Sequence, residues 1–310
     1  MLESYKQYLR HVRHFSPATL QAYGRDLELY RGYLREAGLE GREPTASEAR
    51  GFVGWLSARG LSSRSINRAL SAVRGLFRFT RAHGGQPGPD PFQQVRCLKV
   101  PAHLPSFLLE QEMADLVDGP AAALPGSAGA PKPAASFWEL RDRLILELLY
   151  ATGCRVSELS SMNLTDLDLG ARSIRVRGKG GRERVAFYGA PAAGVLKGYL
   201  QSRRALALAG GREAGKALLI NRRGQRITVR GIQGIVEKAL RASGLPKPAS
   251  PHTFRHSFAT HLLARGRDIR KVQELLGHAS LSSTQVYTHL DIERLAAEYR
   301  LAHPHARREN

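Results

Sequence analysis

A proline- and glycine-rich break near residue 90 constrains the fold more than any other feature of this sequence. Helical periodicity stops at His83, and the following residues read Gly-Gly-Gln-Pro-Gly-Pro-Asp-Pro. The stretch from Val95 to Ser106 contains Pro101 and Pro105 and has little periodicity, which is typical of an extended linker. A chain of 310 residues with such a break should form two domains, each with a core of its own. We predict domains at 1–95 and 107–310, with a linker at 96–106.

The first part of the chain predicts a bundle of four amphipathic helices between residue 1 and about residue 83. Ser16 followed by Pro17 is a typical helix start. Thr45 and Glu48 form a capping-box pattern, in which the two side chains bind exposed backbone donors, and Gly60 suits the end of the same helix.

The last of these four segments, from Leu61 to Arg81, is strongly basic. It contains five arginines and no acidic residue. Solvated helix faces usually alternate the sign of their charges, so contact with DNA phosphates is favoured over a purely solvated face. The residues expected to contact DNA are Arg64, Arg68, Arg74 and Arg78.

The composition of the whole chain supports a polyanionic partner. Lys and Arg number 47 against 27 Asp and Glu, a formal net charge of +20, so binding to polyanions should depend on salt. Nucleic acid is favoured over a membrane, because no apolar run approaches the roughly 18 residues of a spanning helix and no signal peptide opens the chain. The cysteines Cys97 and Cys154 are too few for a disulfide framework or a zinc site, which fits the cytoplasm.

The second part of the chain reads as mainly helical with a small antiparallel sheet. Ser173 to Arg177 and Arg184 to Tyr188 alternate apolar and polar residues around a Gly-Lys-Gly-Gly turn, which predicts a β-hairpin. Ala217 to Asn221 is a possible third strand. A stretch rich in Pro, Ala and Gly at about 119–136 is interpreted as a surface loop.

Several segments of this second part carry residues suited to cutting a phosphodiester without a metal. That reaction needs a nucleophile, cations on the non-bridging oxygens, a base for the nucleophile and an acid for the leaving oxygen. Pro251 and His252 open a helix, and Arg255 lies three residues on, on nearly the same face. His252 could exchange a proton while Arg255 binds phosphate in bidentate fashion. Histidine and arginine at this spacing are also common on ordinary surfaces.

Two further cations lie in turns. Arg155 follows a helix-ending glycine and could bind the phosphate or pair with Glu158 at the surface. Lys179 lies at the tip of the hairpin, where flanking glycines allow close approach of a ligand, and could donate a proton to a leaving oxygen; an exposed basic turn is the alternative. The hairpin arginines around Lys179 are Arg172, Arg175, Arg177, Arg182 and Arg184, of which Arg177 and Arg182 are expected to contact DNA.

His278 and Tyr287 complete the set of candidates. His278 follows a second helix-ending glycine and could donate a hydrogen bond to a phosphate oxygen, while Tyr287 lies in a segment that reads as a short capped helix. A tyrosine is almost fully protonated at neutral pH, so attack by Tyr287 requires a base and a cationic site that stabilises the phenolate. A lone tyrosine is usually an ordinary packed aromatic, and the five basic candidates favour the nucleophile.

Together these motifs resemble the signature of the tyrosine recombinases, and the whole chain looks like the Xer branch of that family. The resemblance implies a SAM-like N-terminal DNA-binding bundle and a mixed α/β catalytic domain. The matching elements are the basic N-terminal helices, the linker end Leu104-Pro105, the segment from Leu146 to Gly153, the hairpin Lys179, the pair His252 and Arg255, the Leu-Leu-Gly-His segment that ends at His278, and Tyr287-Thr-His289.

The resemblance also assigns catalytic roles and needs neither a metal nor another cofactor. It implies Arg155 and Arg255 as phosphate ligands, Lys179 as the acid for the 5′-hydroxyl leaving group, His252 as acid or base, His278 as a hydrogen-bond donor, and Tyr287 as the nucleophile that forms a 3′-phosphotyrosyl intermediate.

The biological role implied by the resemblance is resolution of chromosome dimers at a dif-like site. Four protomers, as a homotetramer or with a second Xer recombinase, would bind double-stranded DNA with an inverted-repeat core site and exchange strands through a Holliday junction. A septal DNA translocase is a possible activator, and the protein would associate with the nucleoid. A helix from Asp291 with Leu295 and Tyr299 resembles a tail that docks on a neighbouring protomer, although it could equally pack on its own domain.

Other functions remain open from the sequence. The nearest are an integrase of a mobile element, a non-cleaving DNA-binding protein on the same scaffold and a type IB topoisomerase, which differs in not requiring paired specific sites. A metal hydrolase is suggested by His252, His256 and His261, but the helix lacks the glutamate of the zinc-protease motif and no third ligand is evident.

Overall fold

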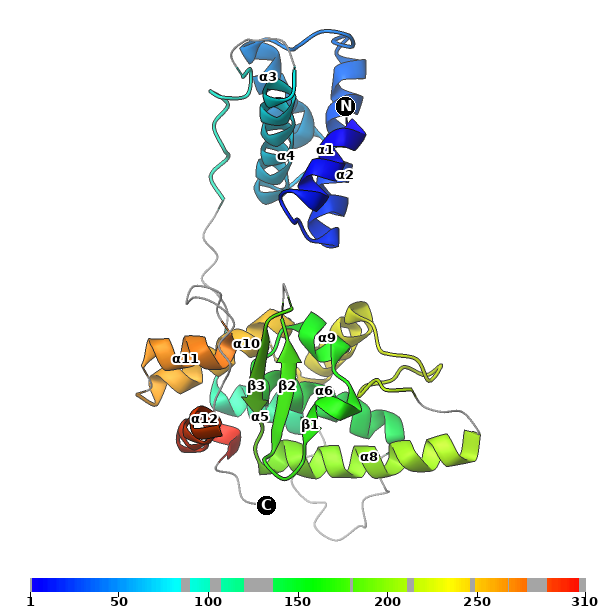
Figure 1. Cartoon of the computed structure of the whole chain (residues 1–310), viewed down its shortest axis with the longest axis vertical. Coiled ribbons are helices and arrows are strands. Elements are labelled where there is room, and N and C mark those ends of the chain that lie inside the picture. The colour runs from blue at the N-terminus through cyan, green and yellow to red at the C-terminus, as the bar shows by residue number, and fades with distance from the viewer. Residues whose placement is uncertain are drawn as a thin grey trace. The chain divides into compact units, whose positions relative to one another are not determined.

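The computed structural model in Figure 1 describes residues 2–84, 90–100, 107–119, 136–178, 181–210, 215–245, 249–266, 268–277 and 289–306. The chain divides into two compact units, Met1–Ala102 and His103–Asn310. Most of the predicted loop at about 119–136 and the predicted short helix around Tyr287 lie outside the described residues. The expected architecture, mainly helical with a small antiparallel sheet in the second unit, is confirmed.

The first unit contains the four predicted helices. They are α1 (Leu2–His11), α2 (Pro17–Glu36), α3 (Ala46–Ala58) and α4 (Ser63–Ala82). Both predicted helix starts are confirmed: the Ser16 hydroxyl accepts a hydrogen bond from the backbone of Thr19, and Thr45 and Glu48 form a reciprocal capping box. The inward faces meet in a core that includes the fully buried side chains of Leu27, Phe52, Ile66, Leu70 and Val73.

Residues 92–98 are held against this bundle. Phe92 is buried in the core of the first unit. The side-chain amide of Asn67 donates to the carbonyl of Leu98 and accepts from its N–H, both at 2.8 Å. Arg74 donates to the carbonyls of Phe92, at 3.1 Å, and of Val95.

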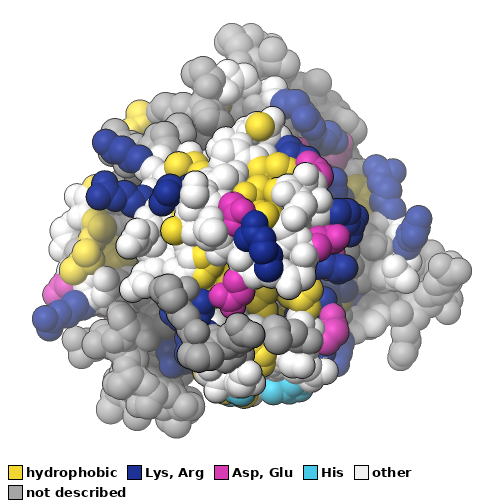
Figure 2. Space-filling model, turned by 90° about the horizontal axis from the view of Figure 1, so that it is seen from above, with side chains coloured by type: hydrophobic (Ala, Val, Ile, Leu, Met, Phe, Trp, Pro, Cys, Tyr) yellow, Lys and Arg dark blue, Asp and Glu magenta, His cyan; other side chains and the backbone are white. Residues whose placement is uncertain are grey.

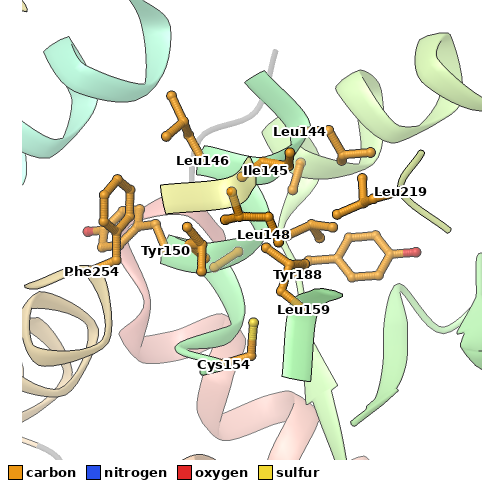
Figure 3. Close-up of a cluster of buried hydrophobic side chains, with 14 of the residues drawn as sticks. Leu144, Ile145, Leu146, Leu148, Tyr150, Cys154, Leu159, Tyr188, Leu219 and Phe254 are labelled. Atoms are coloured by element: carbon orange, nitrogen blue, oxygen red, sulfur yellow. The ribbon is translucent and has the colours of Figure 1, made fainter. Parts of the chain in front are cut away.

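The second unit is built around α6 (Phe137–Thr152), which is buried on most of its surface. Figure 3 shows Leu144, Leu148 and Tyr150 of this helix among buried residues from elsewhere in the unit, such as Phe254 and Leu219. The surrounding helices are α5 (Glu110–Asp118), α7 (Val156–Ser161), α8 (Ala190–Gly210), α9 (Val229–Ser243), α10 (Pro251–Ala264), α11 (Ile269–Leu276) and α12 (His289–Ala302), with short 3-10 helices at Leu164–Asp166 and Pro304–Ala306.

A three-stranded antiparallel sheet lies against α6 in the order β1 (Leu167–Asp168), β2 (Ser173–Arg177), β3 (Glu183–Phe187). The predicted hairpin is confirmed, with β3 one residue earlier than expected. The predicted strand at Ala217 to Asn221 is wrong. This buried segment makes only isolated bridges, from Ala217 to Asn163 and from Ile220 to Arg226, so it pairs briefly with two different neighbours instead of extending one ladder.

The C-terminal helix α12 packs on its own unit. It begins two residues before the expected Asp291, and its Leu295 and Tyr299 side chains are buried against a cluster that contains Phe187 of β3 and Phe258 of α10. The structure of this single chain therefore has the packing that the sequence left as an alternative to docking on a neighbour. In the described part of the chain, no helix has both the length and the apolar character needed to cross a bilayer.

Candidate active site

The site begins where α6 ends at Gly153. This glycine is in the left-handed conformation, with φ of 56°, and caps the helix. A Cβ at this position would lie 2.7 Å from Phe258 of α10 and 2.9 Å from Leu276 of α11. Only glycine leaves room for both Phe258 and Leu276. The absence of a side chain at residue 153 therefore allows the ends of α6 and α11 to pack closely against the middle of α10.

Arg155 follows two residues later as the N-cap of α7. Its backbone N–H donates to Oε2 of Glu158 at 2.9 Å, and its Nη1 donates to Oε1 of the same carboxylate at 2.7 Å. The side chain of Glu158 is only 4% exposed, whereas that of Arg155 is 44% exposed. The pairing that the sequence offered as an alternative to phosphate binding is therefore present. A buried carboxylate holds an accessible guanidinium, so the two interpretations are compatible.

Arg255 lies one turn into α10 and is held by the ends of two other helices. Its Nη1 donates to the carbonyl of Gly153 and its Nη2 to the carbonyl of Leu276, each at 2.7 Å. These contacts join α10 to the last residues of α6 and α11. A guanidinium carries five N–H donors, so these two bonds use only part of the hydrogen-bonding capacity of Arg255.

The environment of Arg255 is strongly cationic. Burial, together with the nearby charges of Arg155 and Arg184, lowers the pKa of Arg255 to about 10, while Glu158 acts in the opposite direction. Arg255 still carries its charge at neutral pH. Because an anion bound among these groups would offset their mutual repulsion, the arrangement suits a phosphate.

His252 is exposed in the first turn of α10, which begins at Pro251 after Ser250 as predicted. It thus lies on the same helix as Arg255, at the end that attracts anions. Lys179, His278 and Tyr287 lie outside the described residues. The structure therefore brings together Arg155 and Arg255, and it places His252 one turn from Arg255.

Arg184 is the residue that the sequence interpretation misplaced. It was expected among the arginines around the hairpin turn, but it is only 7% exposed. Its Nε donates to the carbonyl of Leu275 at 3.1 Å, and its Nη2 lies 3.3 Å from Oε2 of Glu158. The alternation of side chains along β3 could have predicted this burial, because Arg184 and Ala186 lie on the same, inward face of the strand.

The basic helix α4 has structural partners that the sequence did not reveal. Arg68 forms a bidentate ion pair with the buried Asp26 of α2, with N–O distances of 2.8 and 3.0 Å, and Arg81 pairs with Glu43. Arg74 binds the backbone after α4. The segment contains no acidic residue of its own, but Arg68 and Arg81 find acidic partners elsewhere in the first unit.

Contact with DNA remains a prediction for the arginines of both units. Arg64 and Arg78 of α4 are exposed. In the second unit Arg182 is exposed, and Arg177 pairs with Asp166 at 3.2 Å and with Glu183 at 2.8 Å. On the face seen in Figure 2, Lys and Arg side chains lie at several places, some of them beside Asp and Glu side chains.

The histidines of α10 do not form a metal site among the described residues, where no cluster of three or more His, Cys, Asp or Glu side chains could hold an ion. His261 is buried; one ring nitrogen lies 2.9 Å from the Tyr150 hydroxyl and the other 2.9 Å from the carbonyl of Leu108. The carbonyl can only accept, so Nε2 carries the proton and Nδ1 accepts from Tyr150. The ring of His256 packs edge-on against Phe107. Both histidines therefore have packing contacts within the second unit.

Comparison with known proteins places both units of the chain in one family. Residues 130–294 match the phage integrase family, and residues 2–84 match the N-terminal SAM-like domain of phage integrases. The chain belongs to the phage integrase family, the tyrosine recombinases, which break and rejoin DNA.

The chain matches Xer recombinases over almost its whole length. The chain is 38% identical over 314 residues to tyrosine recombinase XerC of Treponema denticola, covering 99% of each protein. It is 37% identical to tyrosine recombinase XerD of Chlorobaculum tepidum, covering 98% of this chain and 96% of that protein. The expected resemblance to the Xer branch and the expected enzyme class, a site-specific DNA recombinase, are confirmed.

Solved structures share the fold. A complex of the XerH site-specific recombinase with a palindromic difH substrate after cleavage has a TM-score of 0.69 at 23% identity, covering 96% of this chain and 84% of that one. A lambda integrase tetramer bound to a Holliday junction has a TM-score of 0.65 at 20% identity, covering 94% of this chain and 79% of that one.

Proposed function

We propose that this recombinase resolves chromosome dimers by strand exchange at an inverted-repeat, dif-like site. The observation that carries the proposal is the convergence of Arg155 and Arg255 at the joined ends of α6 and α11, in a chain whose relatives are XerC and XerD over nearly their full length. Two guanidinium groups placed in this way can bind the two non-bridging oxygens of one phosphodiester.

The proposed reaction assigns one role to each candidate. The phenol oxygen of Tyr287 attacks the phosphorus and forms a 3′-phosphotyrosyl ester, while the bond to the 5′ oxygen breaks. Lys179 gives its proton to that departing oxygen, and His252 exchanges the proton of the nucleophile. Arg155, Arg255 and a hydrogen bond from His278 stabilise the charge that accumulates on the non-bridging oxygens. The ester keeps the energy of the broken bond, so a second 5′-hydroxyl can reseal the strand by the reverse reaction.

The proposed assembly follows from the chemistry of exchange and from the relatives. A crossover between two duplexes needs four cleaved strands, and therefore four protomers on two sites. One structural neighbour is a tetramer on a Holliday junction, and another is bound to a palindromic site. We propose a tetramer of this kind, either of one chain or with a second Xer recombinase, activated by a septal DNA translocase and acting on the nucleoid in the cytoplasm.

Covalent trapping tests the nucleophile and the site together. The protein is mixed, without metal, with a nicked duplex that carries the candidate dif-like site, and the products are separated on a denaturing gel. A protein–DNA adduct that maps by peptide sequencing to Tyr287 is the expected result. The nick allows the short cleaved fragment to diffuse away, so the reverse reaction is prevented and the ester accumulates.

Tyr287→Phe is the matched control, because it removes one oxygen and keeps the ring. It should bind the same duplex normally and form no adduct. Cleavage by this variant would refute the assignment of the nucleophile. Failure of the unmodified protein to form an adduct, alone and with a candidate second recombinase or translocase added, would contradict the proposed function.

A further inference from the structure

Arg184 is a buried charged side chain of β3 that contacts the groups holding both arginines of the candidate site. It is only 7% exposed on β3 and lies against Glu158 in the first turn of α7 and Leu275 in the last turn of α11. Transfer of a guanidinium from water into such a site is costly unless ion pairs and hydrogen bonds offset it. The partners of Arg184 are therefore informative about what its charge does.

Two nitrogens of the Arg184 guanidinium contact different parts of the site. Its Nη2 lies 3.3 Å from Oε2 of Glu158, the carboxylate that also binds Arg155. Its Nε donates to the carbonyl of Leu275 in the last turn of α11, at 3.1 Å. The next carbonyl along the chain, that of Leu276, accepts from Arg255. Arg184 therefore lies between the anchor of Arg155 and the anchor of Arg255.

These contacts form a closed ring. Arg155 binds Glu158, Glu158 faces Arg184, Arg184 holds the end of α11, and the end of α11 holds Arg255. Arg255 in turn binds the carbonyl of Gly153, two residues before Arg155. The halves that carry Arg155 and Arg255 are thus joined twice, directly by the bond from Arg255 to Gly153 and on the other side by Arg184, which alone among these residues lies on a strand.

Gly277 shows how closely α11 and Arg184 fit together. It ends α11 with φ of 64°, and a Cβ there would lie 2.7 Å from Cδ and 3.2 Å from Nε of Arg184. The side chain therefore occupies the space beside the glycine. A smaller or shorter side chain at position 184 would leave the end of α11 without its lateral support.

We propose that Arg184 is a positioning residue of the cleavage site, which fixes the spacing of Arg155 and Arg255 through Glu158 and the end of α11. The inference rests on the proposed function, because both arginines are taken to bind the scissile phosphate. A lysine at this position keeps the charge, but its single ammonium cannot reach Glu158 and the carbonyl of Leu275 with the fixed geometry of a guanidinium.

The test compares Arg184→Lys with Arg203→Lys on the nicked duplex. Arg203 is the matched control, because it is also 7% exposed in the second unit and donates to backbone carbonyls, those of Gly215 and Ala217 at 2.9 Å, in another part of the fold. With protein in excess, the rate of adduct formation should fall about 10²-fold for Arg184→Lys, the size of effect expected from a misplacement of about 1 Å. The DNA dissociation constant and the melting temperature should match those of the control.

A duplex with a methylphosphonate at the scissile position distinguishes a loss of arginine positioning from a general loss of structure in the variant. Replacing one non-bridging oxygen by methyl removes the negative charge that the arginine pair stabilises, so the defect of Arg184→Lys should shrink to about tenfold or less. A defect of equal size on both duplexes, or a cleavage rate equal to that of Arg203→Lys, would overturn the positioning role. If the unmodified protein cleaves and Arg184→Lys cleaves equally well, only this inference fails; if the unmodified protein forms no adduct, the proposed function fails as well.

Discussion

The close packing around Gly153 sets the cost of placing an alanine there. The left-handed conformation of this residue costs any L-residue with a Cβ about 1 kcal/mol. The added methyl would also lie 2.7 Å from Phe258 and 2.9 Å from Leu276, and overpacking of this kind costs about 1–3 kcal/mol. Gly153→Ala should therefore lower the free energy of unfolding of the second unit by about 2–4 kcal/mol.

Gly244→Ala is the control that isolates the steric part. Gly244 also caps a helix of the second unit in the left-handed conformation, but a Cβ there would meet nothing within 4 Å. Gly244→Ala should therefore lower the free energy of unfolding only by the conformational contribution of about 1 kcal/mol. The difference between the two variants, about 1–3 kcal/mol, is the packing energy attributed to the meeting of α6, α10 and α11.

Urea unfolding followed by tryptophan fluorescence measures this difference. The chain has two tryptophans, Trp55 in α3 and Trp138 in α6, so a Trp55→Phe background restricts the signal to the second unit. This matters because two units can unfold in separate transitions. Equal losses of stability in the two alanine variants would refute the steric argument. Slower adduct formation by Gly153→Ala at full DNA saturation is also expected, because the substitution displaces the carbonyl that holds Arg255.

Three further predictions concern charge. Replacing Arg64 and Arg78 by glutamine should weaken DNA binding and reduce the slope of log affinity against log salt by about 0.9 per lost phosphate contact; an unchanged slope in a binding titration would remove α4 from the interface. Asp26→Asn, which breaks the ion pair with the partly exposed Arg68, should destabilise the first unit by about 1–2 kcal/mol in thermal unfolding, and no loss would contradict a structural role for that pair. Burial lowers the pKa of His261 below its usual 6.5, so as the pH falls the unfolded chain binds the proton before the folded chain does. The free energy of unfolding should therefore fall as the pH drops below about 6.5. Urea titrations at pH 7.5 and 5.5 should show less pH dependence for His261→Gln than for the unmodified protein, and identical pH dependence would refute the assignment.

Local features of the fold could be predicted from the sequence because their physics is local. The caps at Ser16 and Thr45 depend on atoms within three residues of one another, and both were predicted correctly. The helix ends at Gly153 and Gly277 follow from the preference of the left-handed conformation for glycine. The hairpin at residues 173–187 also needed only alternation and a turn.

Features that depend on distant contacts could not be predicted in the same way. The run from Ala217 to Ile220 is as apolar as a strand, but only the surrounding core determines that it pairs briefly with Asn163 and Arg226. Asp26 and Arg68 are 42 residues apart, so a search for acidic neighbours within one helix does not find the pair. The burial of Arg184 likewise depends on α11, which is 91 residues away along the chain. In the candidate site, the residue types and their order were readable from the sequence, but the ring that holds them was not.

The ring also explains how a cluster of cations can form without a bound anion. The carbonyls that hold Arg255 belong to the C-terminal ends of α6 and α11, which carry partial negative charge, and Glu158 supplies a full negative charge between Arg155 and Arg184. The fold therefore offsets the repulsion among three guanidinium groups with two helix ends and one buried carboxylate. The N-terminal end of α10, which carries His252, has partial positive charge and therefore attracts an anion. Because folding has already oriented these groups, a phosphate bound as proposed would meet fixed donors and need little reorganisation of the protein. This is the condition under which such donors stabilise a transition state most effectively.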